Sequence, residues 1–113
     1  MRAAAVLLTA GVALVCAAPA QAAKTVRIYD NYFLKDDLTI NRGATVTWRW
    51  PGVYEAGDVH DVKLKSGPKG AKKFHSEAAA TDFTFRRRLK VPGRYRIVCT
   101  LHKEMTMKIR VKR

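Results

Sequence analysis

Short segments in which apolar and polar residues alternate fill the chain from residue 24 onward, and they constrain its fold more than any other feature. The clearest are 44–50 (ATVTWRW), 94–99 (RYRIVC) and 105–113 (MTMKIRVKR). A period of two places successive side chains on opposite faces of a strand, and turn residues such as Pro-Gly separate the segments. One turn at 77–80 (EAAA) is the only stretch that favours a helix. We therefore expect an all-β domain of about eight strands, folded as an antiparallel β-sandwich.

The alternation also predicts which side chains face the core. Further strands are expected at 24–30, 32–40, 59–64 and 82–91. In 59–64 (VHDVKL), His60 falls in the inward row with the apolar residues, and Asp61 falls in the outward row. Trp48 and Trp50 share one face of their segment, so we expect both to pack in the core.

The first 22 residues do not fit this pattern. Arg2 precedes an apolar run over residues 3–18, and Pro19 and the sequence Ala20-Gln21-Ala22 follow it. A short apolar run before an A-x-A motif is typical of a secretory signal, and about 16 residues is short for a spanning helix. We expect cleavage after Ala22, with a domain at 23–113; a retained anchor or a lipid on Cys16 are the alternatives.

Removal of the signal would change the charge and cysteine content. The net charge falls from +13 to about +12 with the loss of Arg2, and Cys99 remains as the only cysteine. An intramolecular disulfide is then impossible, so Cys99 is a dimer-forming thiol, an inert buried thiol or a metal ligand. The basic run at 86–88 (RRR) is by default a solvated surface, and nucleic acid is not an expected partner of an exported protein.

Residues 99–105 (CTLHKEM) gather a thiol, an imidazole and a thioether in one short loop. Cys99 and Met105 fall in inward rows at segment ends, as His60 does, so the three can converge at one pole of a sandwich beside His102. Two histidines, a thiolate and a thioether form the donor set of blue-copper electron-transfer sites. Structural zinc prefers four strong ligands, and covalent haem needs a second cysteine.

Residues 59–64 and 92–111 (PGRYRIVCTLHKEMTMKIRV) together resemble the cupredoxins of the small plastocyanin and amicyanin type. The resemblance implies a Greek-key β-sandwich with one type 1 copper ion held by His60, Cys99, His102 and Met105. Met107 would give the plastocyanin-like spacing. The residues after Met105 (TMKI) match the amicyanin-like spacing, which favours Met105 as ligand and Met107 as core.

Several positions depart from that family's pattern. Leu101 stands where proline is usual, and Lys103 and Glu104 replace apolar residues on the surface where such proteins usually meet partners through an exposed histidine edge. Asp61 replaces an asparagine whose side chain ties the two ligand loops together, and an ionised carboxylate can only accept hydrogen bonds. His75 matches no family position, and we expect it at the surface.

These features predict an exported, monomeric type 1 copper protein that carries single electrons between partners and is not an enzyme. Its location would be the periplasm or another extracytoplasmic compartment. The basic surface favours an acidic redox partner or an anionic membrane surface. A copper-delivery protein, with the metal as cargo, is the alternative, and a metal-free binding module is a third.

Overall fold

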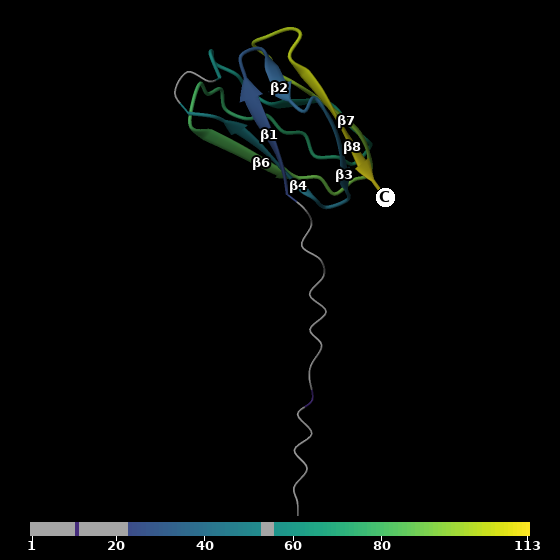
Figure 1. Ribbon diagram of the computed structural model, residues 1–113. Coiled ribbons are helices and arrows are strands. Elements are labelled where there is room, and N and C mark those ends of the chain that lie inside the picture. The colour runs from purple at the N-terminus through teal and green to yellow at the C-terminus, as the bar shows by residue number, and fades with distance from the viewer. Residues whose placement is uncertain (1–10, 12–22, 53–55) are drawn as a thin grey trace, which may run out of the picture.

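The computed structural model describes residue 11 and residues 23–52 and 56–113, so nearly all of the expected signal at 1–22 lies outside the described residues. The strands are β1 (Lys24–Tyr29), β2 (Tyr32–Leu34), β3 (Asp37–Asn41), β4 (Thr45–Trp50), β5 (Lys63–Ser66), β6 (Phe83–Arg88), β7 (Gly93–Val98) and β8 (Thr106–Lys112). They form two four-stranded sheets, β2-β1-β4-β6 and β3-β8-β7-β5, which face each other (Figure 1). The described part of the chain contains no helix of the length and apolarity needed to span a bilayer.

The sheet topology confirms the predicted all-β Greek-key sandwich and adds one detail. Most neighbouring strands are antiparallel, but β1 pairs with β4 and β3 pairs with β8 in parallel. Both sheets are therefore mixed, because the chain passes from one sheet to the other between β2 and β3. Near the C-terminus, β7 and β8 form a hairpin whose connecting loop is 99–105.

The strand expected at 32–40 is in fact two strands in different sheets. Phe33 is buried in β2, whereas Leu38 and Ile40 are buried in β3, so the inward row changes from odd to even residues. Lys35 lies between them with a φ of 69°, a left-handed conformation that ends β2 and redirects the chain. The change of parity is visible in the sequence and marks the crossing.

The segment 59–64 also differs from its prediction, since β5 begins only at Lys63. The backbone of His60 instead exchanges two hydrogen bonds with Ala79, at 2.9 and 3.0 Å, and Ser76 N–H donates to the Val62 carbonyl at 2.8 Å. The helical turn expected at 77–80 is not formed, and Ala79 is instead bridged to His60. This backbone pairing also covers Asp61. The sequence predicted an outward position for this residue, but it is buried, at 4% exposure.

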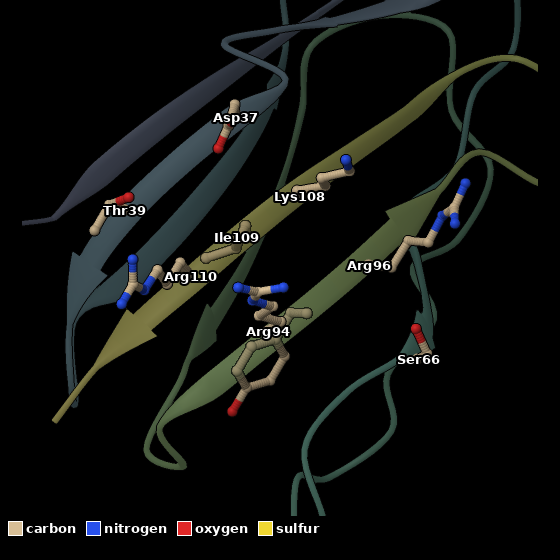
Figure 2. A pocket seen from close by; sticks show the side chains of 9 residues that line it. Asp37, Thr39, Ser66, Arg94, Arg96, Lys108, Ile109 and Arg110 are labelled. Atoms are coloured by element: carbon tan, nitrogen blue, oxygen red, sulfur yellow. The ribbon is translucent and has the colours of Figure 1, made fainter.

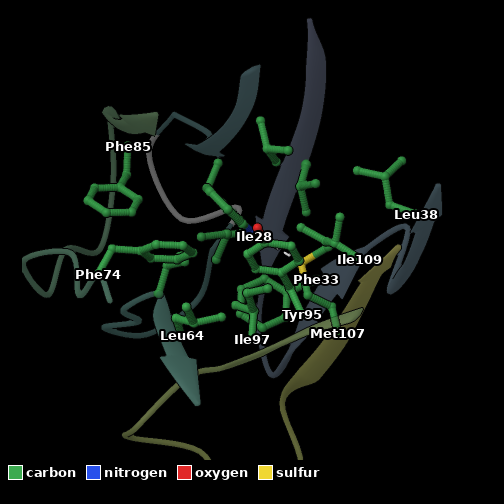
Figure 3. Close-up of a cluster of buried hydrophobic side chains, with 14 of the residues drawn as sticks. Ile28, Phe33, Leu38, Leu64, Phe74, Phe85, Tyr95, Ile97, Met107 and Ile109 are labelled. Atoms are coloured by element: carbon green, nitrogen blue, oxygen red, sulfur yellow. Dashed lines mark hydrogen bonds between the residues drawn. The ribbon is translucent and has the colours of Figure 1, made fainter. Parts of the chain in front are cut away.

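Buried apolar side chains form a core between the two sheets (Figure 3). Both tryptophans are buried, as predicted. The Trp48 ring packs against Phe74 and Phe85, with centroid distances of 5.8 and 5.9 Å. Its Nε1–H donates to Met107 Sδ at 3.2 Å, which joins the two sheets through the core. Trp50 Nε1–H donates to the His60 carbonyl at 3.2 Å, so the core directly holds the backbone of a candidate ligand.

Candidate metal centre

Three of the predicted ligands converge at one pole of the sandwich. The candidate donor atoms of His60, Cys99 and His102 all lie within 4.8 Å of one another. The two Nδ1 atoms are 3.1 Å apart, and Cys99 Sγ lies 4.0 Å from that of His60 and 3.6 Å from that of His102. His60 and Cys99, 39 positions apart in the chain, are thus brought together just beyond the paired ends of β5 and β7, where Lys63 lies opposite Val98.

His60 is held in the tautomer that a metal ligand requires. Its ring is fully buried, and its Nε2 lies 2.7 Å from the Ala56 carbonyl oxygen. A carbonyl oxygen can only accept, so Nε2 carries the hydrogen and Nδ1 presents a lone pair towards Cys99 and His102. A histidine oriented by its other nitrogen in this way is the usual arrangement at a metal.

Cys99 directly follows β7 and is 4% exposed. Its backbone N–H donates to the Met105 carbonyl at 2.9 Å, and Met105 N–H donates to the His102 carbonyl at 3.1 Å, so hydrogen bonds close the loop on itself. Burial raises the pKa of the Cys99 thiol above its ordinary value. A cation between the three donors would stabilise the thiolate, which is the form that binds metals.

His102 forms the solvent-facing edge of the cluster, with 22% of its side chain exposed. Its Nε2 lies 3.5 Å from Asp58 Oδ2. A hydrogen bond from the Val59 backbone and the nearby His102 hold the pKa of Asp58 below its ordinary value. Leu101, at 53% exposure, Lys103 and Glu104 are exposed on the same loop, so apolar, basic and acidic groups lie near this edge.

Both candidate methionines are buried, at 1% exposure each. Met105 is joined to the cluster by the backbone hydrogen bonds of the loop, whereas Met107 accepts its hydrogen bond from Trp48 in the core. Met107 therefore has the core position expected of it. The choice of Met105 as the fourth ligand stays a prediction.

Asp61 links the two chain segments that supply the ligands. Its Oδ1 accepts the Thr100 backbone N–H at 2.6 Å, and its Oδ2 accepts the Thr100 hydroxyl. His75 Nε2 lies 2.7 Å from the same Oδ2. Burial by itself would raise the pKa of Asp61, but the hydrogen bonds from His75 and Thr100 outweigh burial and leave that pKa below its ordinary value.

His75 is exposed at the surface, as predicted, but its contact with Asp61 was not foreseen from the sequence. The side chain is 49% exposed, and its backbone forms a bridge with Lys63. The need for this contact comes from the burial of Asp61, which the sequence placed on an outward row: a buried carboxylate needs donors, and histidine can supply one. Nothing in the local pattern of 71–77 (AKKFHSE) identifies the partner.

The donor set fits copper. Two imidazole nitrogens and a buried thiol sulfur face one another, and a thioether lies on the same loop. Thiolate and thioether are soft donors that select copper, and the absence of a fourth strong ligand among the described residues of the cluster disfavours a structural zinc site.

Comparison with known proteins points to the same chemistry. The profile of the family described as copper-binding proteins of the plastocyanin/azurin family matches residues 20–112. The fold is similar to amicyanin from Paracoccus versutus (30% identity, TM-score 0.67), over 80% of this chain and 81% of that one. It is also similar to a reduced Cu(I) form of an amicyanin mutant (24% identity, TM-score 0.67), over 82% of this chain and 85% of that one.

A third similar structure is the copper-containing nitrite reductase from Thermus scotoductus SA-01, at 25% identity and a TM-score of 0.67. The match covers 81% of this chain but only 23% of the reductase, so the chain corresponds to about a quarter of that enzyme. Among curated proteins, no sequence matches the chain.

Proposed function

Because this chain belongs to the plastocyanin/azurin family of copper-binding proteins, we propose that it carries single electrons between partner proteins by means of one type 1 copper ion. The observation that carries the proposal is the convergence of His60 Nδ1, His102 Nδ1 and Cys99 Sγ at a pole of a rigid sandwich. The chain has no substrate of its own in this proposal. Its similarity to a nitrite reductase is limited to about a quarter of that enzyme.

In this proposal His60, Cys99, His102 and Met105 hold the copper, which supplies a Cu(I)/Cu(II) couple when bound. The protein keeps the donor atoms in one arrangement for both oxidation states. Ala56 orients His60, the Trp50 hydrogen bond holds its backbone, and closure of the 99–105 loop holds the other three. Little rearrangement on electron transfer is what a carrier needs.

Export is the second part of the proposal. Residues 1–22 would be removed as a signal, and the domain at 23–113 would act in the periplasm or another extracytoplasmic compartment. Two features support this proposal: the A-x-A motif at 20–22, and a first strand that begins only at Lys24. N-terminal sequencing of the secreted chain tests it, and a mature protein that retains residue 1 would refute it.

The test of copper binding is titration of the purified 23–113 chain with Cu(II). We expect one equivalent to bind, with intense visible thiolate-to-copper absorption that disappears reversibly on reduction. Cys99→Ser should abolish this absorption, whereas Thr39→Ala, at an exposed residue on the outward side of β3, should keep it. Met105→Gln should retain copper and lower the potential; if Met107→Gln alone does so, Met107 is the ligand.

The same titration separates the carrier from copper delivery. The partial exposure of His102 leaves one side of the cluster open to solvent, which a protein that hands on its metal also requires. Colourless binding of Cu(I) alone would favour delivery, and absence of copper binding would exclude both functions.

A further inference from the structure

We propose that an acidic partner protein docks on the outward face of the β3-β8-β7-β5 sheet, beside Cys99, and not over the exposed edge of His102. This inference rests on the proposed electron-carrier function and assigns its partner surface. The partner is identified by its chemistry, a cluster of surface carboxylates near a redox centre.

Most outward side chains of β5, β7 and β8 are cationic, and they form a largely basic surface beside the polar outward side chains of β3, part of which Figure 2 shows. We call it the basic face; its cations are Lys63, Lys65, Arg94, Arg96, Lys108, Arg110 and Lys112. A shallow groove of about 510 Å³ runs between β3, β8 and β7 and includes Asp37, the single carboxylate on the outward side of these four strands. The face can therefore attract an anionic surface over its whole length.

The cations of the basic face lie opposite one another in the sheet. Arg94 is the direct cross-strand partner of Arg110, and Arg96 is that of Lys108. Like charges at such positions destabilise a sheet. Among the described residues, every ion pair within 4.0 Å involves a histidine, so no carboxylate forms a close ion pair with these four side chains, although Asp37 is the cross-strand partner of Lys108 on β3. An acidic partner would relieve the repulsion on binding.

The edge of His102 is net acidic, because the carboxylates of Asp58 and Glu104 outnumber the cation of Lys103. Asp58 Oδ2 lies 3.5 Å from His102 Nε2, and the carboxylate of Asp30 lies 3.9 Å from His60 Nε2. Both carboxylates are more than half exposed, and Glu104 is exposed on the loop two residues after His102. An acidic partner is repelled there, although the same edge suits a neutral or cationic surface.

The basic face reaches the metal cluster along β7. A depression of about 290 Å³ next to Cys99 and Thr100 is lined by Lys63, Lys65 and Lys103. A partner bound over these lysines lies against the ligand Cys99 without contacting His102. This position favours a protein with its own redox centre over a lipid surface, because it brings the partner close to the copper.

The other sheet provides a matched control. On its outward side Arg86 lies opposite Thr47 and Arg88 lies opposite Thr45, whereas Arg27 lies opposite Arg49, so this sheet also carries a facing pair of cations. This surface also belongs to the sheet that does not contain β7, the strand that leads to Cys99. Equal losses of charge on the two sheets therefore separate docking on one face from the effect of net charge.

The experiment uses the copper-loaded, reduced protein and an oligoglutamate peptide as probe, with amide NMR shifts as the readout. We expect shifts in β5, β7 and β8, and a binding constant that weakens roughly tenfold in a basic-face variant at low ionic strength. That variant combines Lys65→Gln, Arg96→Gln and Lys108→Gln. The control variant combines Arg27→Gln, Arg49→Gln and Arg86→Gln, and it should lose less than about threefold.

The same variants are then oxidised by hexacyanoferrate(III), an anion that takes one electron from Cu(I) and becomes hexacyanoferrate(II). The rate should fall more in the basic-face variant than in the control. Equal losses, or peptide shifts centred on Asp58 and His102 without shifts in β7 and β8, would overturn the inference. Binding to vesicles of equal parts phosphatidylcholine and phosphatidylglycerol at about 0.15 M salt, lost only in the basic-face variant, would reassign the face to membranes. Failure to bind copper reversibly would instead refute the proposed function.

Discussion

Removal of the His75 side chain should destabilise the protein only while residue 61 is a carboxylate. Asp61 is buried and accepts hydrogen bonds from three donors, of which His75 Nε2, at 2.7 Å, is the only one from outside residue 100. His75→Ala leaves Oδ2 with one partner fewer. Asp61→Asn keeps an oxygen for the Thr100 N–H, and its amide N–H groups can donate to the Thr100 hydroxyl and to a neutral His75.

The expected magnitude follows from these contacts. A hydrogen bond to a charged group contributes about 1.5–3 kcal/mol, and the 49% exposure of the His75 side chain allows water to replace part of it. We expect His75→Ala to lower the free energy of unfolding by about 1–2 kcal/mol in the native background. In the Asp61→Asn background it should cost less than about 0.5 kcal/mol, because no buried charge then needs the donor.

Urea unfolding of the copper-free chain, followed by tryptophan fluorescence, measures the four corners of this double-mutant cycle. His75→Gln retains an N–H donor and should recover part of the loss, and Lys73→Ala on the same segment should change stability by less than about 0.5 kcal/mol. A coupling energy below about 0.5 kcal/mol between positions 61 and 75 would refute the reasoning, because independent sites are additive within that limit.

Three further predictions concern the core, acid stability and the copper-free site. Met107→Leu should lower the free energy of unfolding by about 1–3 kcal/mol in thermal or urea unfolding, because Trp48 Nε1–H loses its acceptor, and should leave the copper absorption unchanged, unlike Met105→Leu. Because the pKa of Asp61 is lowered in the folded state, its contribution to stability is complete above about pH 4 and is lost as the pH falls through the folded value. Unfolding measured from about pH 7 to about pH 2 should therefore decline less steeply in Asp61→Asn, and identical slopes would contradict this. In the copper-free protein, the buried Cys99, whose pKa is raised, should react with iodoacetamide at least about tenfold more slowly than a free cysteine at neutral pH; a rate equal to that of the urea-unfolded chain would show that the site opens.

The residue pattern alone identified the sandwich, the inward rows and the composition of the centre. Alternation is a local property, so it correctly predicted that Trp48, Cys99 and Met105 are buried. The proximity of the residues within the 99–105 loop could also be predicted from the sequence, since a hairpin of this length brings its own residues together. The pattern was wrong where pairing partners mattered: a crossing divides 32–40, and β5 starts late because 60–62 pairs with 76–79.

Only the tertiary structure decided how distant groups meet. The alternation of apolar and polar residues shows which face of a strand is apolar. Register and strand order determine which other residues lie against that face. They place His60 Nδ1 3.1 Å from that of His102 and surround the carboxylate of Asp61 with donors. They also put Asp58 and Glu104 at one edge of the cluster, while the cations of β7 and β8 line another. The sequence by itself determined the copper chemistry and the excess of positive charge; the fold determined where each is presented, because these contacts join segments far apart in the chain.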